Sequence, residues 1–176
     1  MKKKGKIILT VVLVLAIAAV VAAVAAFRPQ PVLDPAGTYE VQRVNYWLEG
    51  PNLEWEGYLH TMPTPEQAQE ILALLEGYEK QLSTDRLPQR LLRNLLPAQF
   101  QSMEVQLPEW LEAAIFIWDP ENQDDYFNLI LGNGHVQIRD GYTYLPPYYE
   151  ISNGQQLYQE LDAILHLDQR MAELRD

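Results

Sequence analysis

The amino-terminal end carries the feature that most limits the fold: a long apolar run directly after a cluster of lysines. Four of the first six residues are lysine, and the run from Ile7 to Ala26 contains one polar side chain, Thr10. At about 1.5 Å per residue, an α-helix of this length spans about 30 Å, the thickness of the hydrocarbon core of a bilayer. The run therefore predicts a transmembrane helix over residues 7–26.

The lysines also predict the orientation of this helix. Positively charged flanks remain on the cytoplasmic side, so residues 1–6 are expected to be a cytoplasmic basic tail and the rest to lie outside the plasma membrane. The alternative is a signal peptide cleaved among the small residues 23–26, after which the domain would be secreted. The apolar run exceeds the roughly 7–15 residues of a signal peptide, which favours an uncleaved single-pass anchor.

Charge and cysteine content exclude several kinds of partner. The chain has 13 Lys and Arg against 24 Asp and Glu, and every acidic residue follows the apolar run. Such an acidic surface repels nucleic acid, which is therefore excluded as a partner. Cysteine is absent, which excludes disulfides, Cys-ligated zinc and lipid attachment through a thiol.

Beyond the run, the composition suggests a linker and one domain. Residues 27–37 contain three prolines and a glycine, which predicts a short semi-extended linker. Residues 38–176 are numerous enough to bury one hydrophobic core. The first part of this domain alternates apolar and polar residues over 38–49 and 53–62, which predicts a β-hairpin. The alternation slips between Val41 and Val44, and this slip indicates a β-bulge.

The start of a helix is the best-defined local feature. Thr64 and Gln67 have capping-box spacing, and Pro65 suits the first helical position. An apolar stripe at helical spacing then extends the predicted helix to Leu82.

The remaining segments complete the predicted fold. The patterns predict a short helix at 88–96, strands at 102–107, 113–119, 125–131, 135–138 and 142–145, and a final helix capped by Ser152 or Asn153. Together these elements predict an α+β domain, in which an antiparallel sheet carries helices packed on one face as a two-layer sandwich.

Several of these segments resemble known proteins. The stretches TPEQAQEILALLEGYEK, AAIFIWDPENQDDYFNLIL, GHVQIRDGYTYL and LYQELDAIL are similar to those of small membrane-anchored or lipoprotein-like extracytoplasmic proteins of Gram-positive bacteria, many of them domains of unknown function. The resemblance implies a location at the cell envelope and supplies no active site. This chain departs from the lipoprotein members because it lacks the lipid-attachment cysteine.

The stretch GNGHVQIRDG at 132–141 contains residue types that bind phosphate. A dinucleotide fingerprint requires a third glycine at position 137 and a helix afterwards, but position 137 is glutamine and a strand is predicted. We therefore interpret Gly132, Gly134 and the Asp140-Gly141 pair as turn residues.

No other motif indicates catalysis or metal binding. The three histidines, His60, His135 and His166, lack metal-ligand spacing, and no G-x-S-x-G motif occurs. The acidic segment 119–125 lacks the glycine and glutamate of a calcium loop, so it is interpreted as a hairpin turn. The sequence therefore assigns no catalytic residue, no cofactor and no metal ligand.

Two patches remain as candidate binding surfaces. Arg86, Arg90 and Arg93 share one side of the predicted short helix, where they would meet an anionic partner or the domain's own carboxylates. The second patch is tyrosine-rich, and it is either part of the core or an exposed platform. In it we expect Tyr148 or Tyr149 to be exposed, because adjacent side chains of an extended segment point oppositely. The patch consists of Tyr142, Tyr144, Tyr148 and Tyr149.

These features favour a non-catalytic binding or sensing module, held at the cell envelope by the membrane helix Ile7 to Ala26 and contacting an envelope ligand or protein. Two alternatives remain at this point. One is an envelope hydrolase that uses carboxylates, and the other is a structural subunit of a membrane complex.

Overall fold

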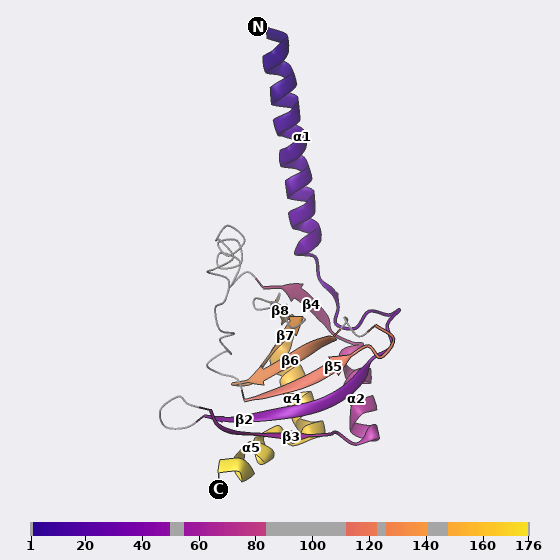
Figure 1. Ribbon diagram of the computed structural model, residues 1–176, viewed down its shortest axis with the longest axis vertical. Helices are drawn as coiled ribbons and strands as arrows, with labels where there is room; N and C mark the ends of the chain where they lie inside the picture. The colour runs from indigo at the N-terminus through magenta and orange to yellow at the C-terminus, as the bar shows by residue number, and fades with distance from the viewer. Residues whose placement is uncertain (1, 50–54, 84–111, 123–125, 141–147, 176) are drawn as a thin grey trace.

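The structure is a computed structural model that describes residues 2–49, 55–83, 112–122, 126–140 and 148–175. Its first helix, α1 (Lys2–Ala26), contains the apolar run and projects away from the rest of the molecule (Figure 1). Between positions 11 and 24 of α1, the large apolar side chains are exposed, from 52% at Val11 to 67% at Val24. Within the described residues, no helix meets the length and apolarity expected of a membrane span.

A single antiparallel sheet forms the centre of the described part of the chain. Its eight strands follow the order β1-β4-β8-β7-β6-β5-β2-β3, and each pair of neighbours is antiparallel. The strands are β1 (Gln30–Pro31), β2 (Glu40–Glu49), β3 (Trp55–Thr61), β4 (Glu79–Leu82), β5 (Ala113–Trp118), β6 (Tyr126–Gly132), β7 (His135–Asp140) and β8 (Tyr148–Ile151).

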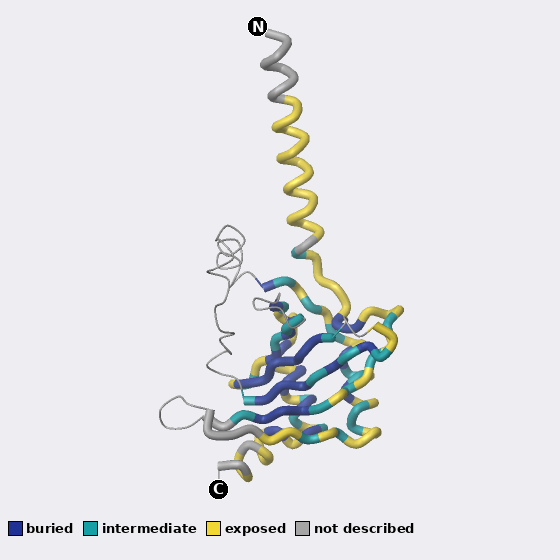
Figure 2. Tube along the Cα trace, viewed as in Figure 1, coloured by how far each residue is buried: buried dark blue, intermediate teal, exposed yellow. Residues whose placement is uncertain are grey.

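Three helices cover one face of this sheet, which we call the inner face (Figure 1). They are α2 (Pro65–Leu75), α4 (Gly154–Leu165) and α5 (Leu167–Arg175). Figure 2 shows that burial is concentrated along the central strands. The fully buried side chains between sheet and helices include Ile71, Leu75, Ile115, Leu129, Ile138, Leu157 and Leu161. The predicted α+β fold, with an antiparallel sheet and helices, is confirmed.

Two local predictions near the start of the domain are also confirmed. β2 pairs with β3 as a hairpin, and the pairing of β2 with β5 shifts register between Val41 and Arg43, where the bulge was predicted. At the start of α2, the Thr64 hydroxyl accepts a hydrogen bond from the Gln67 amide, and the Gln67 side chain accepts one from the Thr64 amide. This reciprocal pair is the predicted capping box.

The prediction that α2 extends to Leu82 is wrong. The helix ends at Leu75, and residues 79–82 form strand β4 between β1 and β8. Gly77 follows the helix and favours its termination. The residues after Gly77 fit the alternating pattern of a strand and the apolar stripe of a helix equally well. Pairing with β8, which is distant in the sequence, makes this segment a strand.

The chain after α1 is part of the domain rather than a spacer alone. Gln30 and Pro31 pair with β4, and Val32 and Leu33 are buried in the core, 1% and 8% exposed. The Val32 amide donates to the Tyr78 carbonyl oxygen at 3.0 Å. The base of α1 is therefore fixed to an edge of the sheet.

In the second half, the turn interpretation of Gly134 is confirmed, whereas Gly132 and Asp140 are the last residues of β6 and β7. Asn133 and Gly134 connect β6 to β7 with φ of 50° and 70°, which is the two-residue hairpin that asparagine and glycine favour. The final helical segment is divided at His166, which has φ 54°. The helix at 88–96, the strands at 102–107 and 142–145, and Gly141 lie outside the described residues.

Candidate functional site

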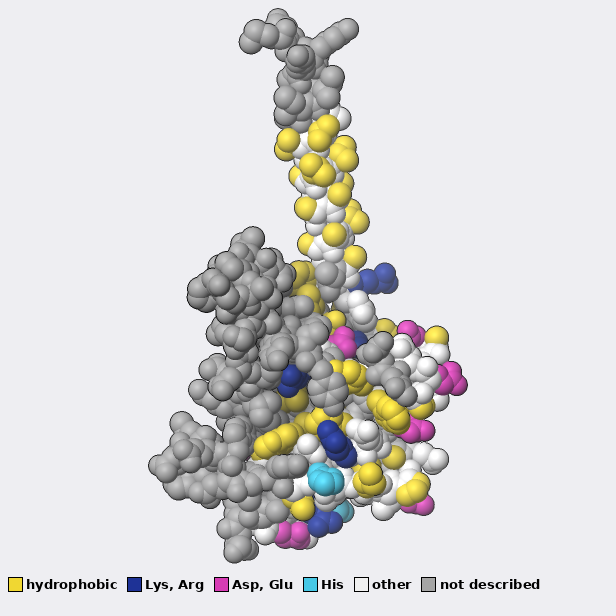
Figure 3. Space-filling view, in the orientation of Figure 1, with side chains coloured by type: hydrophobic (Ala, Val, Ile, Leu, Met, Phe, Trp, Pro, Cys, Tyr) yellow, Lys and Arg dark blue, Asp and Glu magenta, His cyan; other side chains and the backbone are white. Residues whose placement is uncertain are grey.

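The face of the sheet opposite the helices, which we call the outer face, carries a second group of buried residues. Ala114 and Ile130 are 1% and 3% exposed, and Trp47 and Phe116 pack against them. Successive side chains of a strand point to opposite faces of the sheet. In β2, β5, β6 and β7, the residues that alternate with the core residues of the inner face therefore belong to the outer face. Figure 3 looks onto it and shows basic and apolar side chains over the sheet, with acidic ones mainly toward one margin.

One row of paired residues crosses the outer face from β2 to β8. Arg43 pairs with Phe116, Phe116 with Asn128, Asn128 with Arg139, and Arg139 with Tyr148. The Arg43 guanidinium lies 4.4 Å from the centre of the Phe116 ring, a cation–π contact directed across the sheet. Two cations therefore flank Phe116 and Asn128 in the middle of the sheet.

The outer face also contains buried polar atoms without a hydrogen-bond partner. Among the described residues these are the Nε atoms of Arg43 and Arg139 and the Oδ1 atoms of Asn45 and Asn128. Asn45 and Asn128 are only 8% and 4% exposed. Unpartnered buried polar groups are unfavourable and uncommon in folded proteins, so these four atoms make the outer face the candidate site.

The GNGHVQIRDG stretch lines a different feature, a surface hollow of about 690 Å³. The hollow lies where β7 begins, beside the first residues of α4, and both His135 and Glu150 line it. The Asn153 side chain makes no capping hydrogen bond there. Since Asn133 and Gly134 form a hairpin turn, the interpretation of Gly134 as a turn residue is confirmed, whereas Gly132 is the last residue of β6.

The tyrosine patch is described only in part. Tyr148 is 6% exposed on the outer face, and Tyr149 is partly buried against the inner core, with Lys80 Nζ 5.2 Å from its ring centre. Neither ring is substantially exposed, so the expected exposure of one of this pair is wrong. Both tyrosines belong to β8, which pairs with β4 on one side and β7 on the other, and this pairing buries their rings. The prolines before Tyr148 do not prevent the pairing. Tyr142 and Tyr144 lie outside the described residues.

The other residues considered from the sequence do not form a site in the described part of the chain. Arg86, Arg90 and Arg93 lie outside the described residues. The histidines are dispersed among β3, β7 and the α4–α5 junction, and the described residues contain no group of three metal-ligating side chains. Of the acidic segment, Asp119 accepts a hydrogen bond from the Glu121 amide, as in a turn.

Two carboxylates surround the Tyr158 hydroxyl at the junction of α4 and α5. That hydroxyl lies 3.0 Å from Asp168 Oδ1 and 3.4 Å from Glu112 Oε2. Burial first, and then the hydrogen bond to Asp168 and the nearby negative charges, raise the pKa of Tyr158 well above its usual value. The tyrosine therefore remains protonated and donates a hydrogen bond. We interpret the group as a contact that joins the helices to β5.

A second tyrosine–carboxylate pair connects α4 to the segment before β4. The Tyr78 hydroxyl donates to Glu160 Oε2 at 2.7 Å, and Gln156 donates to the other carboxylate oxygen at 2.9 Å. Burial, followed by the hydrogen bond and the negative charge of Glu160, raises the pKa of Tyr78 to about 12. Hydrogen bonds from Gln156 and Tyr78 lower the pKa of Glu160.

This pair predicts a stability change at high pH. The pKa of Tyr78 is raised from 10.0 to about 12 by folding, so its contribution is complete below pH 10 and is lost as the pH rises to 12. We expect the stability advantage of the wild type over Tyr78→Phe, measured by urea unfolding, to be constant up to about pH 9. It should shrink above pH 10. In the Glu160→Gln background this shrinkage should be smaller, and an advantage that stays constant up to pH 12 contradicts the prediction.

Comparison with known proteins does not identify a family for this chain. No protein-family model, curated protein or solved structure matches the chain. The outer-face row is therefore identified from geometry alone. Sequence reasoning missed Arg43 and Asn128, and it considered Arg139 only as part of GNGHVQIRDG. One signal was present, because an asparagine inside the apolar strand YFNLIL is unusual unless its amide has a partner.

Proposed function

We propose that this protein is a binding module held at the outer side of the plasma membrane by α1, with residues 1–6 in the cytoplasm. The observation that carries the proposal is the all-round apolar surface of α1. In a globular protein, a helix with apolar residues on every side is buried in a core or in a bilayer. The large apolar side chains described on α1, from Val11 to Val24, are half or more exposed, so the domain does not cover them.

Attachment at the base of the helix supports the same arrangement. Val32 and Leu33 are buried in the domain core only a few residues after α1 ends. A helix inserted in a bilayer would therefore hold the domain close to the membrane surface. The lysines at positions 2, 3, 4 and 6 favour a cytoplasmic N-terminus by the positive-inside rule.

The outer face of the sheet supports the binding role. Within the described residues it contains four buried polar atoms without a partner, the Nε atoms of Arg43 and Arg139 and the Oδ1 atoms of Asn45 and Asn128. A hydrolase would need paired carboxylates in a cavity. Three carboxylates, Glu76, Glu79 and Glu160, line the hollow of about 640 Å³, but Glu160 already accepts hydrogen bonds from Tyr78 and Gln156. We favour binding because of the unpartnered polar atoms of the outer face.

Limited proteolysis of intact cells tests the location. We expect protease added outside to digest the domain from residue 38 onward, and the purified membrane-bound protein to retain Lys2 on N-terminal sequencing. A tag placed before Met1 should be protected until the membrane is permeabilised. A mature N-terminus among residues 24–27 would instead support a secreted protein, and protection of the domain would contradict an outside location.

A further inference from the structure

We propose that Arg43, Asn45, Asn128 and Arg139 form a binding site on the outer face for a peptide segment that carries carboxylates. The inference deepens the binding role proposed above and rests on that role for its place in the cell. Its evidence is independent of α1, because it comes from the pairing and burial of residues in β2, β6 and β7.

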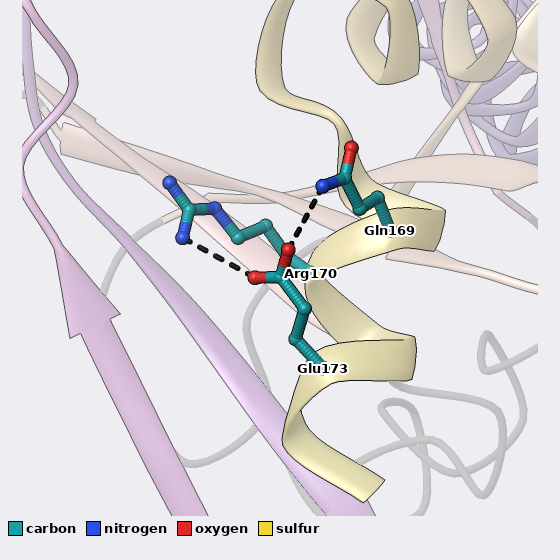
Figure 4. Close-up of polar contacts among 3 residues, drawn as sticks. All are labelled: Gln169, Arg170 and Glu173. Atoms are coloured by element: carbon teal, nitrogen blue, oxygen red, sulfur yellow. Dashed lines mark hydrogen bonds and ion pairs between the residues drawn. The ribbon is translucent and has the colours of Figure 1, made fainter. Parts of the chain in front are cut away.

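Arginines without an ion pair are unusual in a chain with such an excess of acidic residues. With 24 acidic and 13 basic residues, an arginine readily finds a carboxylate, as Arg170 does with Glu173 at 3.5 Å (Figure 4). Within the described residues, Arg43 and Arg139 have no such ion pair, and their Nε atoms are buried without an acceptor. Each of these two Nε–H groups therefore lacks an acceptor in the described part of the chain.

The strand register places both cations near Asn128. Arg43 extends over the Phe116 ring on β5, the strand next to β6, and Arg139 is the direct partner of Asn128 on β7. At about 4.8 Å between strands, the Cα atoms of the two arginines are about 14 Å apart. A carboxylate above β6 can thus be approached from both sides, and the planar fork of each guanidinium suits its two oxygens.

The unpartnered acceptors determine the rest of the ligand's chemistry. Oδ1 of Asn45 and Oδ1 of Asn128 are buried and need hydrogen-bond donors. Inorganic phosphate offers chiefly acceptor oxygens, whereas a peptide presents backbone N–H groups beside acidic side chains. The apolar contacts of Phe116 and Trp47 with the outer-face cluster provide a surface for the peptide's carbon atoms. An acidic peptide matches the donors, acceptors and apolar surface together.

The test is a titration of the full chain in micelles of an uncharged detergent. Acetyl-Glu-Glu-amide is the probe, acetyl-Gln-Gln-amide is its uncharged match, and inorganic phosphate represents a simple anion. Binding is measured by calorimetry and by tryptophan fluorescence, since Trp47 lies at the site. We expect the Glu peptide to bind, and the Gln peptide and phosphate to bind at least tenfold more weakly.

Variants locate the site. Arg43→Gln and Arg139→Gln should each weaken binding of the Glu peptide at least tenfold, whereas Arg170→Gln, which removes a paired arginine on α5, should leave it unchanged. If Arg139→Gln does not fold, Arg139→Lys keeps the charge and should still weaken binding because it lacks the fork. Asn128→Leu should abolish binding and leave the melting temperature equal or higher, because it removes an unpartnered buried amide.

Several results would overturn the site. They are absence of binding to the folded wild type, equal binding of phosphate, an equal loss in Arg170→Gln, or a lower melting temperature in Asn128→Leu. Because the chain is in micelles, the outcome does not depend on its location in the cell. A chain that binds the peptide but is not membrane-held overturns the anchor alone, and a membrane-held chain without binding overturns this site alone.

Discussion

Replacing Ile71 by aspartate is expected to unfold the domain at room temperature. Ile71 is fully buried between α2 and the sheet. The change removes its packing and places an unpaired carboxylate in the core, at a combined cost of roughly 5 kcal/mol or more. That cost is comparable to the whole stability of a typical domain, about 5–15 kcal/mol.

The measurement is tryptophan fluorescence and near-UV circular dichroism of the full chain in detergent during urea unfolding. These signals report the domain, whereas far-UV dichroism would also contain α1. Ala73→Asp is the matched control, because Ala73 is exposed on the same helix. It should cost about 0.5 kcal/mol through helix propensity alone. A cooperative Ile71→Asp transition at the wild-type urea concentration would show that α2 does not pack as described.

Ile71 is a sharper probe than its neighbour Leu72, although both belong to the apolar stripe visible in the sequence. Leu72 is only partly buried and packs at the margin of the core. Helical periodicity identifies the buried side of a helix, but it does not say which residue on that side is deepest. That depends on where the sheet strands lie beneath the helix.

Local signals were the part of this fold that could be predicted. The capping box of Thr64 and Gln67, the bulge after Val41 and the Asn133-Gly134 turn all depend on a few adjacent residues, and the structure contains each of them. The physical cause lies in the residues themselves: a hydroxyl that caps amides, and a glycine that accepts positive φ.

Non-local pairing was the part that could not be predicted. Strand β4 forms because Lys80 meets Ile151 and Leu82 meets Tyr149, residues far along the chain. The candidate site has the same origin, since Arg43, Asn128 and Arg139 are adjacent only through the registers of β2, β5, β6 and β7. Alternation can place a residue on one side of its own strand, but it does not show that three strands align these residues in one row.

Placing charge in the middle of α1 is expected to release the protein from the membrane. Each aspartate at the centre of a membrane-spanning helix costs about 2.5–3.5 kcal/mol of insertion free energy. Val14→Asp combined with Ala18→Asp should therefore cost about 5–7 kcal/mol, which is enough to reverse a marginal insertion equilibrium. The domain should remain folded, because α1 projects away from it (Figure 1).

Alkaline carbonate extraction of membranes measures this release. We expect the wild type in the pellet and the double aspartate variant largely in the supernatant, with the unfolding transition of its domain unchanged. The matched control, Val14→Leu with Ala18→Leu, alters the same positions while keeping them apolar, and it should stay in the pellet. Wild-type protein in the supernatant would mean that the exposed apolar surface of α1 is covered by another protein rather than by lipid. The anchor proposal would then fail, and the outer-face site would remain open to its own test.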